Sequence, residues 1–379
     1  MRKYHLLAPG PTPVPPEVLE AMARPLMHHR TKDFEAIFQE IREGLSWLYQ
    51  AEGDVITLAA SGSGGMEATV ANLLSPGEKA LIVEGGKFGE RWVEICAAYG
   101  VETDVLSVEW GRSVNVDEIE ARLKAGGHRA LFVQASETST GAKHDVRKIA
   151  ETTRRVSPDT LIGVDAITAL GVYDIQPAEW DLDAVITGSQ KALMLPPGLA
   201  FVWLSARAWA AAEVSRSPRY YFDLRIERKI QAKNTTAWTP AISLIAGLKV
   251  AFDMMRKEGI ENIFARHARL AAGTRAAFSA LGLEIFPRDL LSESVSAVSV
   301  PDGIDGKAIP RLMQGEQGIT IAGGQGHLTG KIFRIGHMGY VDESDVFAAI
   351  GGLEAVLAGL GHGLTKGAGL VAAQEEFCK

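Results

Sequence analysis

Between residues 17 and 205, short apolar runs alternate with longer stretches whose apolar residues recur at helical spacing. This alternation constrains the fold more than any other feature, because neighbouring parallel strands need a long crossover, usually a helix, between them. The expected strands are Val55–Ala60, Ala80–Glu84, Ala130–Ala135, Leu161–Asp165, Ala184–Thr187 and Leu199–Leu204. The expected helices include Phe34–Tyr49, Val116–Leu123 and Val146–Arg155. The pattern predicts an α/β domain with a mostly parallel sheet flanked by helices.

The two ends of the chain follow different patterns. Residues 1–16 contain five prolines, which favours an extended N-terminal arm over a helix. We expect a large domain over residues 17–255 and a smaller C-terminal α+β domain over residues 256–379. The elements expected around and beyond residue 255 are helices Ile242–Lys257, Ile260–Leu281, Gly306–Gln314 and Glu343–Leu360, and strands Glu284–Phe286, Val295–Val300 and Ile332–Ile335. The tail after Gly361 is assigned no structure.

Charge and composition exclude several classes of function. The 39 Lys and Arg residues and 46 Asp and Glu residues give a net charge of -7 with no basic block, so no nucleic-acid partner is expected. No apolar stretch approaches the roughly 20 residues that span a bilayer, and the N-terminus does not resemble a secretion signal. Two cysteines, and nine histidines without metal-like spacing, predict neither a disulfide framework nor a metal site. We therefore expect a cytoplasmic protein.

A glycine- and serine-rich loop, Ser61–Ala68, follows the first strand of the large domain and opens a helical run. Free N–H groups at a helix N-terminus, together with the positive end of the helix dipole, suit a phosphate. The alternative is a tight turn between strand and helix with no ligand. The loop matches neither the ATP-binding nor the dinucleotide-binding pattern, so the predicted phosphate belongs to another cofactor.

Two charged residues follow later strands of the same predicted sheet. Asp165 ends the run Leu161–Asp165, and Lys191 comes shortly after Ala184–Thr187. Open α/β sheets bind ligands at the carboxyl ends of their strands, so both side chains are expected at that edge. A helix N-cap is the alternative role for Asp165. A lysine, a carboxylate and a phosphate loop together match the needs of pyridoxal 5'-phosphate: a Schiff base, a partner for the ring nitrogen and an anchor.

Further motifs give the chain a family resemblance. The sequence resembles the class V aminotransferases of pyridoxal-phosphate fold type I, the group containing alanine/serine–glyoxylate aminotransferases. The resemblance extends over essentially the whole chain. The segments that carry it are 7–13, 25–30, 61–67, 86–92, 137–141, 164–166, 188–191, 196–198, 239–244 and 333–336.

The resemblance implies a role for each of several cofactor-binding residues. Lys191 forms the Schiff base and Asp165 pairs with the ring nitrogen. The phosphate contacts are expected from Ser63, Gly64, Gly65 and Gln190.

Other implied contacts surround the cofactor ring. Ser139 is expected to hydrogen-bond the hydroxyl side of the ring. Phe88 takes the stacking position, often Trp in the glyoxylate-specific relatives, while Ile167 packs beneath. Thr236 is expected to reach the phosphate of the neighbouring subunit, with Thr235 and Thr239 as alternatives.

Two residues are expected at the substrate. Arg334 takes the position of the arginine that binds the substrate carboxylate, and Gly10 brings the arm's backbone to the substrate. A planar guanidinium holds a carboxylate through two parallel hydrogen bonds. From the residues alone, a salt bridge between the domains is the alternative for Arg334.

The predicted function is transamination between alanine or serine and glyoxylate or another small 2-oxo acid, in a homodimer with shared active sites. Phosphoserine, aspartate and aminoethylphosphonate aminotransferases share this scaffold and remain alternatives. A non-catalytic subunit associated with a hydrogenase is a further alternative. Hydrogenase metal centres need several thiolates, and this chain has two cysteines.

Overall fold

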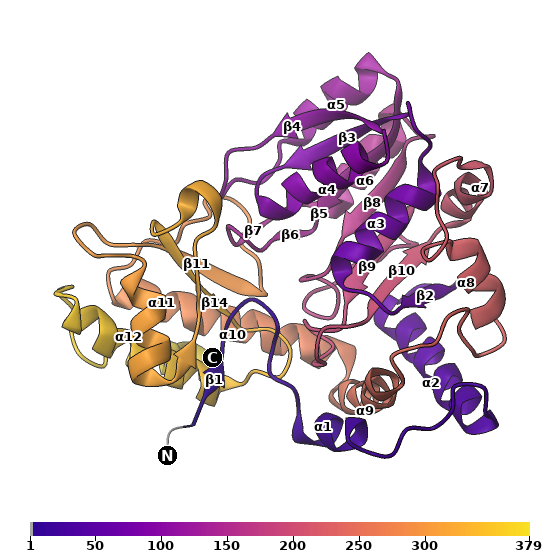
Figure 1. Ribbon diagram of the computed structural model, residues 1–379. Helices are drawn as coiled ribbons and strands as arrows, with labels where there is room; N and C mark the ends of the chain where they lie inside the picture. The colour runs from indigo at the N-terminus through magenta and orange to yellow at the C-terminus, as the bar shows by residue number, and fades with distance from the viewer. Residues whose placement is uncertain (1–2) are drawn as a thin grey trace.

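A seven-stranded sheet forms the centre of the computed structural model, which describes residues 3–379 (Figure 1). Its strands are β2 (Val55–Leu58), β3 (Lys79–Glu84), β4 (Glu102–Ser107), β5 (His128–Gln134), β8 (Leu161–Asp165), β9 (Ala184–Gly188) and β10 (Ala200–Leu204). They lie in the order β2-β10-β9-β8-β5-β3-β4. Of the seven strands, β10 alone runs in the opposite direction to the other six. The predicted α/β fold with a mostly parallel sheet is confirmed.

Helices cover both faces of this sheet. They are α1 (Pro16–Met22), α2 (Lys32–Tyr49), α3 (Gly62–Leu73), α4 (Lys87–Ala98), α5 (Val116–Ala125), α6 (Val146–Val156), α7 (Ala206–Val214), α8 (Leu224–Gln231) and α9 (Ile242–Glu258). Successive strand residues point to opposite faces, so Leu81 joins a core with α2 and α9, while Ile82 joins a second core with α3 and α4. A strand buried on both faces reads as a continuous apolar run, which is why the sequence revealed it.

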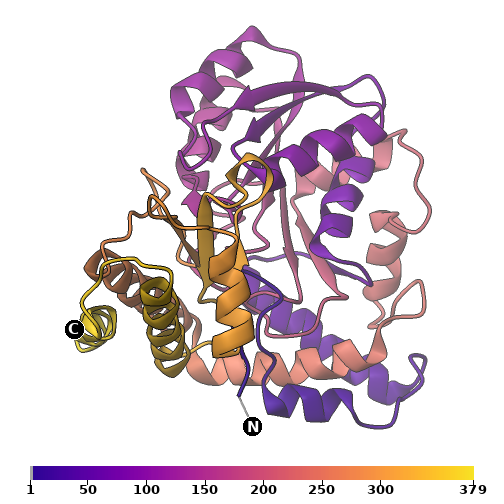
Figure 2. The ribbon, with the colours of Figure 1, turned by 60° about the vertical axis from the view of Figure 1, so that its left-hand side comes forward.

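The C-terminal part forms a smaller α+β unit beside the large domain (Figure 2). Its elements are α10 (Ile260–Ala280), β11 (Val295–Ser299), α11 (Ala308–Leu312), the π-helix η1 (Met313–Gln317), β12 (Ile319–Thr320), β13 (Ala322–Gly323), the 3₁₀ helix η2 (Gly326–Leu328), β14 (Ile332–Gly336), α12 (Glu343–Gly359) and α13 (Ala368–Phe377). β14 is the central strand of the antiparallel sheet β11-β14-β13.

The N-terminal arm joins the two parts. Its strand β1 (His5–Leu6) pairs in parallel with β12 of the small unit, and the chain then passes to α1 below the large domain (Figure 1). A short hairpin, β6 (Ser136–Glu137) and β7 (Ala142–Lys143), lies on the same side of the large domain as the small unit.

Several predicted elements differ from the observed ones. β4 and α13 were not expected; β4 is an edge strand with mixed exposure, and α13 lies in the tail to which no structure was assigned. The strand expected at Glu284–Phe286 is reduced to a single bridge between Ile285 and Val298. The proposed domain boundary at residue 255 falls inside α9. Over residues 3–379, no helix is long and apolar enough to cross a membrane.

Candidate active site

Lys191 lies in the turn after β9 and is only 9% exposed. Its Nζ donates a hydrogen bond to the carbonyl oxygen of Pro9 in the arm. Burial lowers the pKa of Lys191 to about 8; the charges of Arg334 and Arg91 act in the same direction, and Asp165 opposes them. An amine with such a pKa is partly neutral near physiological pH, as a nucleophile or general base requires.

Asp165 ends β8, the strand next to β9, so both predicted residues lie at the carboxyl edge of the sheet. Its carboxylate accepts the N–H of Ile167 at 2.9 Å. Burial raises the pKa of Asp165 to about 6, while the Ile167 N–H and the charges of Arg91 and Lys191 lower it. Turns, not a helix, follow Asp165, so the alternative role as a helix N-cap is not realised.

The predicted phosphate loop opens α3, which begins at Gly62. Its N-cap residue, Ser61, makes no capping bond through its side chain, so the leading N–H groups of the helix, Ser63 and Gly64 included, have no side-chain partner there. The N–H of Gly65 instead donates to Ser61 O at 3.2 Å, within the helix. Gly65 has a packing role: an added Cβ would lie 2.7 Å from Ile186 Cγ2. Ser63 and Gly64 therefore suit a phosphate better than Gly65.

Gln190 precedes Lys191, and its Oε1 is buried with no hydrogen-bond partner among residues 3–379. A buried polar group without a partner is costly, so such groups are expected to meet a ligand or water. A half turn of the amide presents its two N–H donors, which suit a phosphate oxygen. This unpaired amide and the uncapped start of α3 fit the predicted phosphate group.

Gly10 lies directly against Lys191. Its φ of +122° is unfavourable for other residues, and an added Cβ would overlap Lys191 Nζ. The arm is fixed here by Thr12, whose hydroxyl donates to Lys191 O at 2.9 Å. It is also fixed by the N–H of Gly336, which donates to Leu7 O at 2.7 Å. The arm therefore forms one wall beside the lysine.

Arg334 lies on β14 and is 5% exposed. Its Nη1 donates to Thr138 O of the large domain at 2.8 Å, and its Nε and Nη2 donate to Gly323 O at 3.1 and 2.7 Å. Burial lowers the pKa of Arg334 to about 10, and the nearby Glu137 opposes this. Arg334 forms no salt bridge with an acidic group of residues 3–379, so the alternative of a salt bridge between the domains is not realised. Two of the five N–H groups of Arg334 remain for a carboxylate.

Phe88 and Ile167 were expected on the two faces of the cofactor ring. Phe88 lies in the first turn of α4, half-buried, with the guanidinium carbon of Arg91 4.9 Å from its ring centre. Ile167 is buried against the start of α3, where an added Cβ on Gly62 would overlap its side chain. Their contacts with the ring stay predictions.

Ser139 is completely buried, and its hydroxyl is already engaged. Its Oγ donates to Glu137 Oε1 at 2.5 Å and accepts the N–H of Lys87 at 3.1 Å. The expected contact with the cofactor hydroxyl must therefore use its remaining lone pair. Sequence reasoning gave Glu137 no role, although a glutamate among small and hydroxyl residues, directly after a buried strand, was a usable signal.

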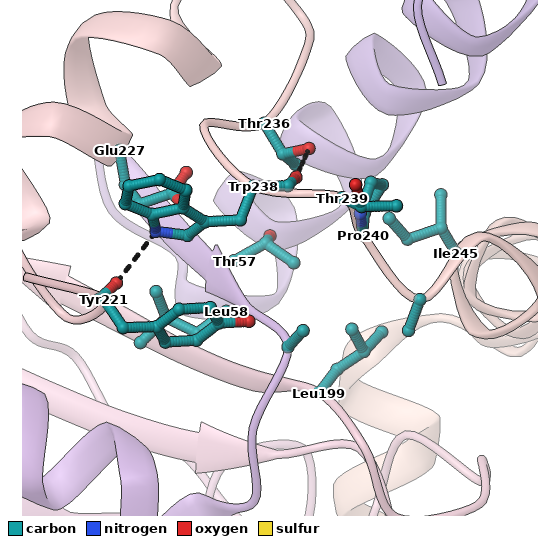
Figure 3. A pocket seen from close by; sticks show the side chains of 12 residues that line it. Thr57, Leu58, Leu199, Tyr221, Glu227, Thr236, Trp238, Thr239, Pro240 and Ile245 are labelled. Carbon is teal, nitrogen blue, oxygen red and sulfur yellow. Dashed lines mark hydrogen bonds between the residues drawn. The ribbon is translucent and has the colours of Figure 1, made fainter. Parts of the chain in front are cut away.

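The segment around Thr236 lines a small cavity near the start of α9 (Figure 3). Thr236 is buried, and its hydroxyl donates to Trp238 O at 2.7 Å. Thr235 donates to His29 O at 3.3 Å. The contact of Thr236 with the phosphate of a neighbouring subunit stays a prediction, and its hydroxyl oxygen is still able to accept a hydrogen bond. Of the three threonines, Thr239 is the exposed one.

Comparison with known proteins decides the family. The sequence pattern of the family described as "Aminotransferase class-V" matches residues 4–346. The chain belongs to the class V aminotransferases. It is therefore a pyridoxal-phosphate-dependent transferase acting on small amino and oxo acids, and the position of Lys191 and Asp165 at one edge of the sheet suits that cofactor.

Relatives of this aminotransferase carry different names. It is 44% identical to the small subunit of a soluble hydrogenase from Synechococcus, over 98% of this chain and 97% of that protein. It is 36% identical to the L-aspartate–glyoxylate aminotransferase of Paracoccus denitrificans, over 98% of this chain and 96% of that protein. The crystal structure of ureidoglycine–glyoxylate aminotransferase from Bacillus subtilis superimposes with a TM-score of 0.93 at 31% sequence identity. The superposition covers 100% of this chain and 99% of that protein. The aminotransferase thus has the predicted fold type I.

Proposed function

We propose that this aminotransferase moves an amino group from alanine or serine to glyoxylate or another small 2-oxo acid. The observation that carries the proposal is Arg334. Its guanidinium is buried where the two domains meet, its position is fixed by carbonyl oxygens from both, and two N–H groups remain for a substrate carboxylate. Because Gly10 has no side chain, the backbone of the arm lies directly against Lys191 and closes this side of the site, which favours a compact substrate.

Lys191 and Asp165 have different roles in the proposed reaction. When bound, pyridoxal phosphate supplies an electron-withdrawing ring that stabilises negative charge at the substrate Cα. Lys191, with a pKa lowered to about 8, is able to take and return the proton at Cα. Asp165 favours the protonated ring nitrogen, since a carboxylate stabilises a neighbouring cation.

The names of the relatives support glyoxylate as the amino acceptor more than they support alanine or serine as the amino donor. Both the Paracoccus and the Bacillus proteins are named for glyoxylate, whereas their donors are aspartate and ureidoglycine. Aspartate, phosphoserine and aminoethylphosphonate therefore stay as alternative donors. The hydrogenase name of the Synechococcus protein keeps a second, non-catalytic role as an alternative.

We further propose a cytoplasmic homodimer whose active sites are shared. Tyr220 is 74% exposed and Tyr221 is 41% exposed, and both rings lie against Trp238, next to the exposed Thr239. Exposed aromatic clusters are typical of protein interfaces. A second copy of the chain over this surface would bring the segment of Thr236, with Thr235 and Thr239 as alternatives, toward the neighbour's phosphate. Both cysteines are free thiols, in keeping with a reducing compartment.

The direct test is a panel of amino acids added to the purified protein loaded with pyridoxal phosphate. Alanine or serine should bleach the visible cofactor band in a single half-reaction, and glyoxylate should restore it. Bleaching by aspartate but by neither small amino acid would replace the proposed donor. A protein that binds the cofactor but reacts with no member of the panel would favour the non-catalytic role.

A further inference from the structure

Glu137, at the end of β6, is completely buried, yet its carboxylate has four hydrogen-bond donors around it. Oε1 accepts the N–H of Ser139 at 3.2 Å and its hydroxyl at 2.5 Å. Oε2 accepts the N–H of Phe88 at 3.2 Å and that of Gly89 at 3.1 Å. One carboxylate thus joins the turn 138–139 to the first turn of α4.

The arrangement needs a negatively charged carboxylate. Each oxygen faces a backbone N–H, which is able only to donate, so an amide or a protonated acid would oppose one donor with another. Burial raises the pKa of Glu137 to about 7 and Asp165 adds to this, while the bonds from Ser139 and Gly89 lower it. The start of a helix also favours negative charge, because of its free N–H groups and dipole.

Gly86 makes the close approach possible. A Cβ at this position would overlap both the Glu137 carboxylate and Ser139 Oγ. Its φ of 166° is an extended conformation open to any residue, so the missing side chain, and not backbone freedom, is what this position requires.

Each of the two segments that Glu137 joins carries a site residue. The first turn of α4 carries Phe88, expected on the cofactor ring, and the carbonyl of Thr138 holds Arg334, expected on the substrate carboxylate. We propose that Glu137 is a positioning residue that fixes the ring-facing Phe88 and the carboxylate-binding Arg334 relative to each other. This inference rests on the proposed function for the roles of Phe88 and Arg334.

Glu354 provides a matched control. It is also a buried glutamate at a helix start: its oxygens accept the N–H groups of Gly367 at 2.7 Å and Gly369 at 2.9 Å, at the beginning of α13 in the small domain. Neither α13 nor Glu354 contributes a predicted site residue. Glu137→Gln and Glu354→Gln therefore make the same chemical change in two places.

The first measurement is amide hydrogen exchange by mass spectrometry on the full chain, with and without pyridoxal phosphate. In Glu137→Gln, the peptide spanning residues 86–92 should exchange about tenfold faster or more, because two amides lose a charged partner. Glu354→Gln should accelerate only the peptide at the start of α13. Unchanged exchange at residues 86–92 in Glu137→Gln overturns the proposal, whatever the substrate proves to be.

The second measurement separates positioning from general weakening of the fold. Glu137→Gln should raise the KM for both amino and oxo acid by about tenfold, and it should reduce the visible circular dichroism of the bound cofactor. Glu354→Gln should leave both values within twofold of the parent protein. Equal losses in the two variants would assign Glu137 a merely structural role.

Gly86→Ala is the second route to the same contact if Glu137→Gln fails to fold. The added methyl group should displace the carboxylate from Phe88 and Gly89 while keeping the charge. It should reproduce the faster exchange at residues 86–92 and the higher KM. A Gly86→Ala protein with parental exchange and KM contradicts the inference. Failure to transaminate the chosen substrates would affect only the proposed function, since the exchange test does not use them.

Discussion

Two buried aspartates lie at opposite ends of neighbouring strands and have very different surroundings. Asp183, just before β9, accepts hydrogen bonds from Arg207 Nε at 3.0 Å, Ser205 Oγ at 2.6 Å and the N–H of Ile162 at 2.8 Å, and it pairs with Arg154 at 2.5 Å. Within residues 3–379, Asp165, at the carboxyl end of β8, accepts a hydrogen bond only from the N–H of Ile167.

The difference shows what each end of the sheet is built for. At the amino end the protein itself satisfies the buried charge, so the cluster is complete as a structural unit. At the carboxyl end Asp165, Lys191 and Arg334 keep donors or acceptors for a ligand, and burial shifts the pKa of each. Perturbed pKa values in such a setting are typical of functional sites.

The largest effect is expected from Lys191→Ala, which removes the amine at the ligand end. Turnover should fall by about 10²–10⁴-fold, the usual contribution of a general base, while the phosphate contacts still hold the cofactor. Steady-state kinetics measures the loss of turnover, and equilibrium dialysis of pyridoxal phosphate measures whether the cofactor is still bound. Full turnover in this variant would remove Lys191 from the mechanism.

The next largest effect is expected from the two aspartates, each changed to asparagine. Asp183→Asn should lower the free energy of unfolding by about 3–5 kcal/mol, because two arginines lose their buried partner, and it should leave kcat/KM nearly unchanged. Asp165→Asn should keep its stability and lose kcat by about tenfold or more, since the ring nitrogen loses its counter-charge. Urea unfolding and kinetics measure both. If the two variants lost stability and kcat to the same extent, the proposed difference between the two ends of the sheet would be wrong.

Arg334→Ala should lower kcat/KM by about 30-fold or more, since removing one member of a charged pair costs about 2–5 kcal/mol. The loss should be equal for the amino donor and the oxo acid, because both present the same carboxylate. Arg334→Lys should recover only part of it, as an ammonium cannot form the paired hydrogen bonds. Normal kcat/KM in the folded, loaded Arg334→Ala protein would limit Arg334 to joining the domains.

The smallest effect concerns pH and the protein without cofactor. The pKa of Asp165 is raised from 3.8 to about 6, so the folded state holds this proton more tightly than the unfolded chain does. The contribution of Asp165 to stability is present below about pH 4 and is lost as the pH rises to about 6. Tm should fall by a few degrees across this window. Asp165→Asn should shrink the change, and Asp183→Asn should not.

Much of the fold was predictable because its signals are local. β8 was found at its full length, Leu161–Asp165, since a strand buried on both faces is one continuous apolar run. β4 was missed because an edge strand with alternating exposure lacks that run. The positions of Asp165 and Lys191 were also predictable from local signals. Each lies at or just after the end of an expected strand, which predicted that both lie at the carboxyl edge of the sheet. The parallel pairing of β8 with β9 confirms this prediction.

The hydrogen bond of the Thr236 hydroxyl and the hydrogen bonds of Glu137 were not predictable in this way. Thr236 donates to a carbonyl two residues away, a choice set by the fold of a loop without periodicity. Glu137 meets Phe88 across 49 residues of sequence, and Arg334 meets Thr138 across 196. Such partners depend on how whole elements pack.

The sequence by itself therefore determined the α/β order of elements, the charged residues at the strand ends and the family. These follow from the spacing of side chains along a single strand or helix, which the chain carries locally. The tertiary structure alone decided which buried charges are paired and which are left for a ligand. That difference depends on hydrogen-bond geometry between distant segments, where a shift of about 1 Å makes or breaks the bond.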